Sequence, residues 1–128
     1  MEDLVYDAVI PSLFRIVPEA KDAYDAWEMP GDPLPYIVFG FLEESLLTPA
    51  VESGDHPDLL RRIFEFLEGM AVSRSEEVVT LLWVGLFEAW ATSPRTLGKA
   101  LAYMLPATRM LASQAARQIA GLDLTSMS

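Results

Sequence analysis

The chain offers few side chains that could do chemistry, and these few lack the neighbours that catalysis needs. It has one histidine, His56, and no cysteine among its 128 residues. A serine hydrolase needs a nucleophile, a base and an orienting group, and both Ser53 and Asp55 stand near His56. No G-x-S-x-G turn surrounds Ser53, however, and His56 precedes Pro57 in a segment typical of a loop. We therefore expect an exposed loop histidine, with Asp55 capping the next helix, and no catalytic residue.

The sequence also gives no support for a metal or cofactor site. The absence of cysteine excludes zinc–thiolate sites, and a single histidine excludes sites that need two imidazoles. Carboxylates do occur in pairs, at Glu43-Glu44, at Glu65 with Glu68, and at Glu76-Glu77. None of these pairs belongs to the Glu-x-x-His motif of helical di-metal sites, and no glycine-rich phosphate-binding motif is present. The sequence therefore predicts no metal, no cofactor and no enzymatic activity.

One further carboxylate interrupts the most apolar segment of the chain, residues 78–91. This segment is shorter than the roughly 20 residues that a membrane-spanning helix needs, so we expect a buried core helix. Glu88 lies within it. Because a buried carboxylate needs a partner, we predict a structural salt bridge from Glu88 to Arg61, Arg62 or Arg74.

The net charge of -10 is concentrated in the N-terminal half of the chain. Residues 1–58 contain 13 acidic and 2 basic side chains, whereas residues 59–128 contain 6 acidic and 7 basic ones. An acidic surface repels nucleic acid and anionic membranes and attracts basic proteins. We therefore predict a basic protein partner, no nucleic acid and no membrane.

The carboxylates are densest in the helix expected after Pro18, where they recur every three residues beside an apolar stripe. Like charges at this spacing oppose one another by roughly 0.2–0.5 kcal/mol per pair, so helix stability does not explain them. They are either a binding surface for a basic partner or a solvated face that keeps the protein soluble. The predicted partner-binding residues are Glu19, Asp22, Asp25, Trp27, Glu28, Asp32, Tyr36, Glu43 and Glu44.

Apolar residues repeat at helical spacing nearly throughout, which predicts an all-α fold. The expected helices cover about residues 4–17, 18–28, 35–47, 57–71, 75–91 and 94–120, with a loop over 48–56. We expect a single helical domain over residues 1–120 and a frayed C-terminal tail over residues 121–128. The simplest arrangement is a compact bundle of five or six amphipathic helices, and irregular stacking of antiparallel helix pairs is the alternative.

Several residues make specific local predictions. Pro11 kinks or splits the first helix, and Pro106 kinks or divides the last. Ser73 and Glu76 match a capping box at the start of the fifth helix. Gly85 costs about 1 kcal/mol there relative to alanine, so a closely packed neighbour is expected. If the last helix is continuous, its basic residues form one line, as a polar face or as a complement to the acidic half. These residues are Arg95, Lys99, Arg109 and Arg117.

Three segments carry a resemblance to a known group of proteins. They read LPYIVFG at 34–40, RRIFEFLEGM at 61–70 and SEEVVTLLWVGLFE at 75–88. Over about residues 10–92 the chain resembles small uncharacterised bacterial all-helical proteins, a group that is similar to the immunity proteins of polymorphic and contact-dependent toxin systems. The resemblance implies a small cytoplasmic inhibitor that neutralises a cognate toxin and has no catalytic residues.

Two functions from different classes follow from these observations. The first is a non-enzymatic immunity-type inhibitor that binds a basic protein toxin through the acidic N-terminal face. The second is a helical adaptor or scaffold protein that binds its partner through an apolar groove near residues 36–41. The N-terminus lacks the basic region of a secretory signal, so we expect a cytoplasmic protein. The sequence favours no particular oligomeric state.

Overall fold

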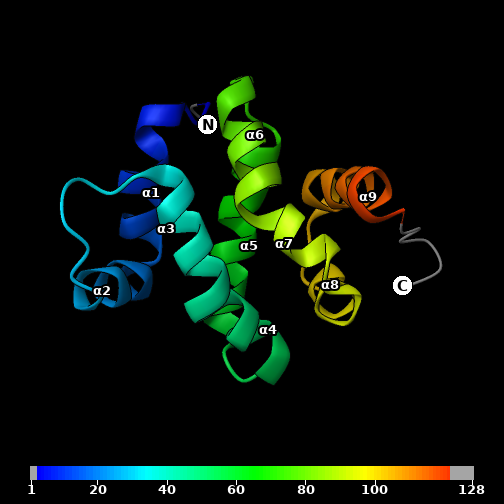
Figure 1. Ribbon diagram of the computed structural model, residues 1–128, viewed down its shortest axis with the longest axis horizontal. Helices are drawn as coiled ribbons and strands as arrows, with labels where there is room; N and C mark the ends of the chain where they lie inside the picture. The colour runs from blue at the N-terminus through cyan, green and yellow to red at the C-terminus, as the bar shows by residue number, and fades with distance from the viewer. Residues whose placement is uncertain (1–2, 122–128) are drawn as a thin grey trace.

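The computed structural model describes residues 3–121, which form helices and connecting loops and contain no strand. The predicted all-α class is confirmed. The elements in chain order are η1 (Tyr6–Ala8), α1 (Val9–Ile16), α2 (Pro18–Ala26), α3 (Pro35–Leu42), η2 (Glu43–Leu47), α4 (Thr48–Ser53), α5 (Pro57–Ala71), α6 (Glu76–Leu82), η3 (Trp83–Phe87), α7 (Glu88–Ala91), α8 (Pro94–Leu101) and α9 (Pro106–Ala120) (Figure 1). Residues 1–2 of the predicted domain and 122–128 of the predicted tail lie outside the described residues.

Proline sets the start of most of these helices. Because proline has no N–H and a fixed φ, it suits the first helical position, where the amide would be unpaired in any case. Five helices begin in this way, at Pro18, Pro35, Pro57, Pro94 and Pro106. Pro106 therefore divides the expected last helix, and the described residues form seven continuous helices instead of five or six. Pro11 also lies in the first turn of its helix, α1. The residues just before α1 form a separate 3-10 turn, η1.

Two of the continuous helices contain a π-helical turn. In the helix over residues 35–53 this turn is η2, in which the N–H of Thr48 reaches the carbonyl of Glu43. A proline in a regular helix would clash with the carbonyl four residues earlier, and the wider turn lets the helix continue through Pro49. The helix ends only at Gly54, whose φ is 68°. The loop predicted over residues 48–56 is therefore wrong for residues 48–53.

The N-terminus of α6 is capped by Ser75, and the capping box predicted from Ser73 is not formed. The Ser75 side chain accepts the N–H of Val78 at 3.4 Å. Ser73 instead donates its hydroxyl to the carbonyl of Leu4 at 2.6 Å, and the N–H of Arg74 donates to the carboxylate of Asp3 at 3.2 Å. These hydrogen bonds tie the first described residues to the turn between α5 and α6.

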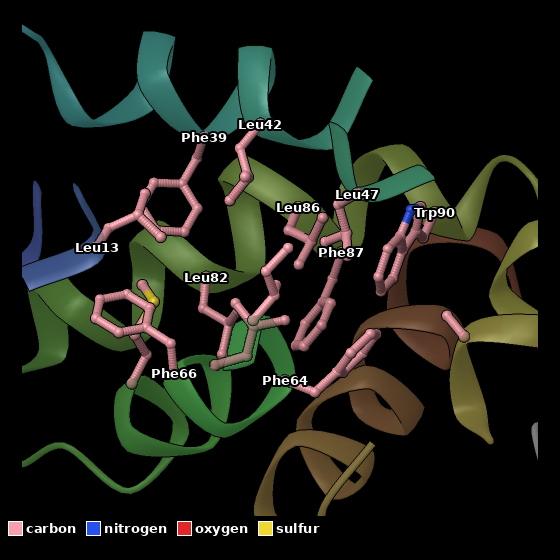
Figure 2. Packing of buried hydrophobic residues seen from close by; sticks show 14 of the residues in the cluster. Leu13, Phe39, Leu42, Leu47, Phe64, Phe66, Leu82, Leu86, Phe87 and Trp90 are labelled. Carbon is pink, nitrogen blue, oxygen red and sulfur yellow. The ribbon is translucent and has the colours of Figure 1, made fainter. Parts of the chain in front are cut away.

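One contiguous apolar core joins the helices (Figure 2). Its largest fully buried side chains include Phe39, Phe64, Phe87 and Trp90. The indole N–H of Trp90 donates to the hydroxyl of Thr48 at 3.1 Å, which satisfies the only polar atom of this buried ring. Gly85 packs closely, as predicted, because a Cβ atom there would lie 3.1 Å from Cβ of Phe39.

The helix pairs at the two ends of the chain lie at opposite ends of the long axis of the molecule (Figure 1). Helix α5 lies between them and packs against α1, α4, α6 and α9. Helices α1 and α2 pack together at one end, and α7 contacts both α8 and α9 near the other. None of the described helices is both long enough and apolar enough to cross a membrane.

The position of Glu88 differs from the prediction. It begins α7 with an exposed side chain and forms no salt bridge with Arg61, Arg62 or Arg74 within residues 3–121. The helix over residues 76–91 has an exposed edge that also includes Thr80 and Val84, spaced four residues apart. Glu88 continues this edge, so its charge stays in water.

Candidate functional site

Helix α2 is held against α5 by one of the predicted binding residues. The two guanidinium Nη atoms of Arg62 donate to the two carboxylate oxygens of Glu19, one of them at 2.9 Å. Arg62 also donates to Asp58 at 2.9 Å and to the carbonyl of Ile16 at 3.0 Å. The hydrogen bond from Arg62 lowers the pKa of Glu19 in spite of its partial burial. Glu19 therefore links α2 to α5, and its carboxylate is already occupied by Arg62.

The next three carboxylates, two on α2 and one just after its end, are open to solvent. Asp22, Asp25 and Glu28 are all exposed. Asp25 forms an ion pair with Lys21 one turn earlier, whereas Asp22 and Glu28 form none within the described part of the chain. Glu28 has φ of 57° and follows the end of α2, so it turns the chain into the proline-rich segment 29–35. The three side chains leave a carboxylate edge facing solvent.

Trp27 forms an aromatic platform beside this edge. Its ring stacks on Phe41 with centroids 4.9 Å apart and planes inclined by 15°, and Tyr24 meets both rings edge-on. The Trp27 side chain nevertheless remains 48% exposed. A tryptophan fixed by stacking and still open to solvent loses little rotamer freedom when a partner covers it.

A cavity of about 430 Å³ lies between the N-terminal helical segment and the proline-rich loop. Two carboxylates reach it from distant parts of the sequence, Asp7 from η1 and Asp32 from the loop. Neither forms an ion pair within residues 3–121. The remaining lining residues are aromatic or aliphatic, and they are Tyr6, Ile10, Pro11, Phe14, Pro33 and Pro35. We call this site the acidic pocket.

We call the acidic pocket together with the exposed carboxylates Asp22, Asp25 and Glu28 the acidic surface. From the acidic pocket, further polar side chains continue toward α3 and α6. Burial raises the pKa of Tyr6, and the nearby Tyr36, Glu77 and Asp7 raise it further. The structure thus brings predicted residues Asp32 and Tyr36 near Tyr6, Asp7 and Glu77, which the sequence reasoning missed. No local pattern marks Tyr6, Asp7 or Glu77, because only the fold brings η1, the loop and α6 together.

The last two predicted residues separate at the π-helical turn. Glu43 is half-buried and accepts the hydroxyl of Thr48 at 3.2 Å, and Thr48 in turn accepts the N–H of Trp90. Burial raises the pKa of Glu43, which outweighs the opposing effect of Thr48. The neighbouring Glu44 is exposed. Glu43 therefore belongs to the margin of the core, and only Glu44 remains on the surface.

The basic residues near the C-terminus do not form one line, because Pro106 separates α8 from α9. Lys99 forms an ion pair of 2.7 Å with Glu52 and so links α8 to α4. Arg109 donates to the carbonyl of Leu101 at the end of α8 at 3.3 Å. Arg95 and Arg117 are exposed. Two members of the predicted line thus stabilise contacts between helices.

His56 is exposed, as expected, but the predicted cap by Asp55 is not formed. The N-terminus of α5 has no side-chain cap, and the N–H of Asp55 donates to the hydroxyl of Ser53 at 3.2 Å. Within residues 3–121, no three histidine or carboxylate side chains are grouped so that they could hold a metal ion.

Comparison with known families gives one match. The family model described as a domain of unknown function, DUF7674, matches residues 10–121. No curated protein and no solved structure matches the chain. The family match extends from α1 to the end of α9 and includes the proline-rich loop of the acidic pocket. Since it covers most of the sequence, the chain belongs to the DUF7674 family.

Proposed function

We propose that this protein is a non-enzymatic, immunity-type inhibitor that acts in the cytoplasm and neutralises a basic protein toxin. The acidic pocket is the observation that carries this proposal. A lysine or arginine side chain combines an aliphatic stem with a cationic head. In the acidic pocket the stem would lie against Phe14 and Pro33, and the head would bind the carboxylates of Asp7 and Asp32.

The surroundings of the acidic pocket also suit a basic protein partner. Asp22, Asp25 and Glu28 extend the negative potential along α2, which would speed the encounter with a cationic surface. Trp27 would supply an aromatic anchor that a partner can cover. Blocking a toxin in this way requires no catalytic group, and charge and aromatic contact are sufficient.

Co-expression with the product of the neighbouring gene, taken as the candidate toxin, tests the proposal. We expect the wild-type protein to protect the cells, and the double variant Asp7→Lys/Asp32→Lys to bind the toxin at least about tenfold more weakly and lose protection. Glu88→Lys is the matched control, because it reverses an exposed carboxylate on α7 that is not part of the acidic pocket. Undiminished protection by the double variant would contradict the role of the pocket. Protection that also survives reversal of Asp22, Asp25 and Glu28 would exclude the acidic surface as a whole.

An adaptor protein is the second candidate function. The exposed apolar side chains at the start of α3 support it, because Leu34, Tyr36 and Ile37 are 58%, 42% and 37% exposed. Ionic strength separates the two candidates. Binding through the acidic surface should weaken steeply between low and high salt, whereas binding through these apolar side chains should change little. A salt-insensitive complex that Ile37→Glu abolishes would favour the adaptor.

A further inference from the structure

A second and larger cavity lies apart from the acidic pocket and has a different chemical character. It is an open groove of about 750 Å³ between α1 and α5, and its lining also includes residues 3–4 and Arg74. Apolar side chains from both helices line it, among them Ile16, Phe66 and Val72. We call it the α1–α5 groove.

Two arginines of the α1–α5 groove have no ion-pair partner within residues 3–121. The described residues before Pro94 include five basic side chains, and Lys21, Arg61 and Arg62 each form ion pairs. Arg15 and Arg74 form none, and both line this groove. For Arg15 this is unexpected, because residues 1–58 contain 13 acidic and only 2 basic side chains.

The two carboxylates that line the same groove are already engaged. Glu65 accepts a hydrogen bond from Arg61 at 3.1 Å, and Asp3 accepts the backbone N–H of Arg74 at 3.2 Å. Within residues 3–121, the charges of the groove that have no ion pair are therefore one carboxylate, that of Asp3, and two guanidinium groups, those of Arg15 and Arg74. Together with the apolar lining, the two guanidinium groups suit a ligand that is both acidic and apolar.

Gly69 supports a binding role for this groove. A glycine inside a helix costs about 1 kcal/mol relative to alanine, and such a cost usually has a packing or conformational reason. At Gly85 that reason is the close approach of Phe39. A Cβ atom at Gly69 would meet nothing within 4 Å, and its φ is not positive. Gly69 lines the α1–α5 groove, so its missing side chain leaves the groove open there.

We propose that the α1–α5 groove binds an acidic amphipathic helix of a partner protein. The lining residues run from Arg62 on α5 to Val72, the residue that follows this helix, a length of about 15 Å or roughly three helical turns. The rim is open, with Val72 61% exposed, unlike the enclosed sites that bury small ligands. An apolar helix face covers Ile16, Phe66 and Val72, and flanking carboxylates bind Arg15 and Arg74. This surface shares no residue with the acidic pocket, so the inference is independent of the proposed function.

A panel of fluorescently labelled synthetic helices tests this inference on the full chain by anisotropy. The panel contains amphipathic peptides of leucine and glutamate about four turns long, the same peptides with lysine in place of glutamate, and scrambled forms. We expect the leucine–glutamate peptides to bind. Gly69→Leu and the double variant Arg15→Glu/Arg74→Glu should each weaken binding by about tenfold or more.

Two variants serve as matched controls. Gly40→Leu fills an equally open helical position on α3, and Arg117→Glu reverses an exposed arginine on α9. Both should bind as the wild type does, and circular dichroism should show that all variants fold. Equal binding by Gly69→Leu, or no preference for the leucine–glutamate peptides over the lysine or scrambled forms, would overturn the inference. Decanoate binding that Gly69→Leu blocks, without peptide binding, would assign the groove to small amphiphiles and overturn it as well.

Discussion

Glu43 and Glu68 are both half-buried, yet their surroundings shift their pKa values in opposite directions. Burial is the largest effect on each carboxylate and raises its pKa. At Glu68 it is outweighed by hydrogen bonds from the N–H groups of Ala107 and Thr108, at 3.0 and 2.8 Å, and from the hydroxyl of Thr108, at 2.7 Å. At Glu43 the single hydrogen bond from the hydroxyl of Thr48 does not outweigh the effect of burial, so the pKa stays raised. The same residue type thus opposes folding at one site and supports it at the other.

For Glu43 we predict that replacement by glutamine stabilises the protein at neutral pH. A carboxyl group whose pKa is raised by folding ionises more readily in the unfolded chain, so stability falls as the pH rises above its ordinary value of 4.5. Glu43→Gln removes this loss and should raise the melting temperature at pH 7 but hardly change it at pH 4. Glu44→Gln, at the exposed neighbour, is the control and should have little effect at either pH.

For Glu68 the opposite result is expected. Its carboxylate accepts the first N–H groups of α9, where a negative charge is favourable, and Glu68→Ala should cost about 2 kcal/mol at pH 7. Because folding lowers the pKa of Glu68, its contribution is present above pH 4.5 and is lost as the pH falls through the pKa of the folded state. Urea unfolding of the wild type and Glu68→Ala at pH 7 and pH 3 measures this contribution. An equal loss of unfolding free energy at both pH values would contradict the prediction. Glu65→Ala, at an exposed position on the same helix, should change stability much less.

At the scale of the elements, two glycines in neighbouring helices offer a direct comparison. The Cβ atom of any larger residue at Gly85 would press on Phe39, whereas space is open at Gly69. Gly85→Leu should therefore destabilise the fold by about 1–3 kcal/mol, and Gly69→Ala should stabilise it by up to about 1 kcal/mol. The free energies of unfolding of both variants, measured by chemical denaturation, test these two predictions. A stable Gly85→Leu protein would mean that α3 can move away from η3.

The starts of the helices could be predicted from the sequence, because proline fixes them locally. Pro18, Pro57 and Pro94 begin helices as expected, and the apolar spacing gave the all-α class. The end of the third helix was misplaced, since Pro49 normally indicates a loop and only a π-helical turn lets the helix pass it. Local spacing carries no information about such a turn.

The candidate site was less predictable for a related reason. The periodic carboxylates of α2 look alike in sequence, yet Glu19 lies against Arg62 of α5, more than forty residues later in the chain. Asp7 and Asp32 belong to different expected elements and share a cavity only after folding. The composition places most of the carboxylates in residues 1–58, and long-range packing determines which of them form ion pairs and which lie exposed.

At the scale of the whole molecule, the uneven charge should make stability depend on salt. Residues 1–58 contain 13 acidic and only 2 basic side chains, so repulsion between carboxylates opposes the compact state. Added salt screens this repulsion more than it weakens the few local ion pairs. We expect the melting temperature at pH 7 to rise by a few degrees between about 0.02 and 0.3 M sodium chloride. A fall over the same range would show that the surface ion pairs dominate.

The π-helical turn η2 makes the length of the helix over residues 35–53 as important as its composition. Each residue of a helix turns the chain by about 100°, so deleting one residue from the turn would rotate α4 by that angle relative to α3. Leu42 and Val38 would keep their places in the core, while Ala50 and Val51, which are buried in the intact helix, would be turned out of theirs. In this part of the molecule a change in chain length is therefore more damaging than a substitution, and homologous sequences should differ here by exchange of residues and not by gaps.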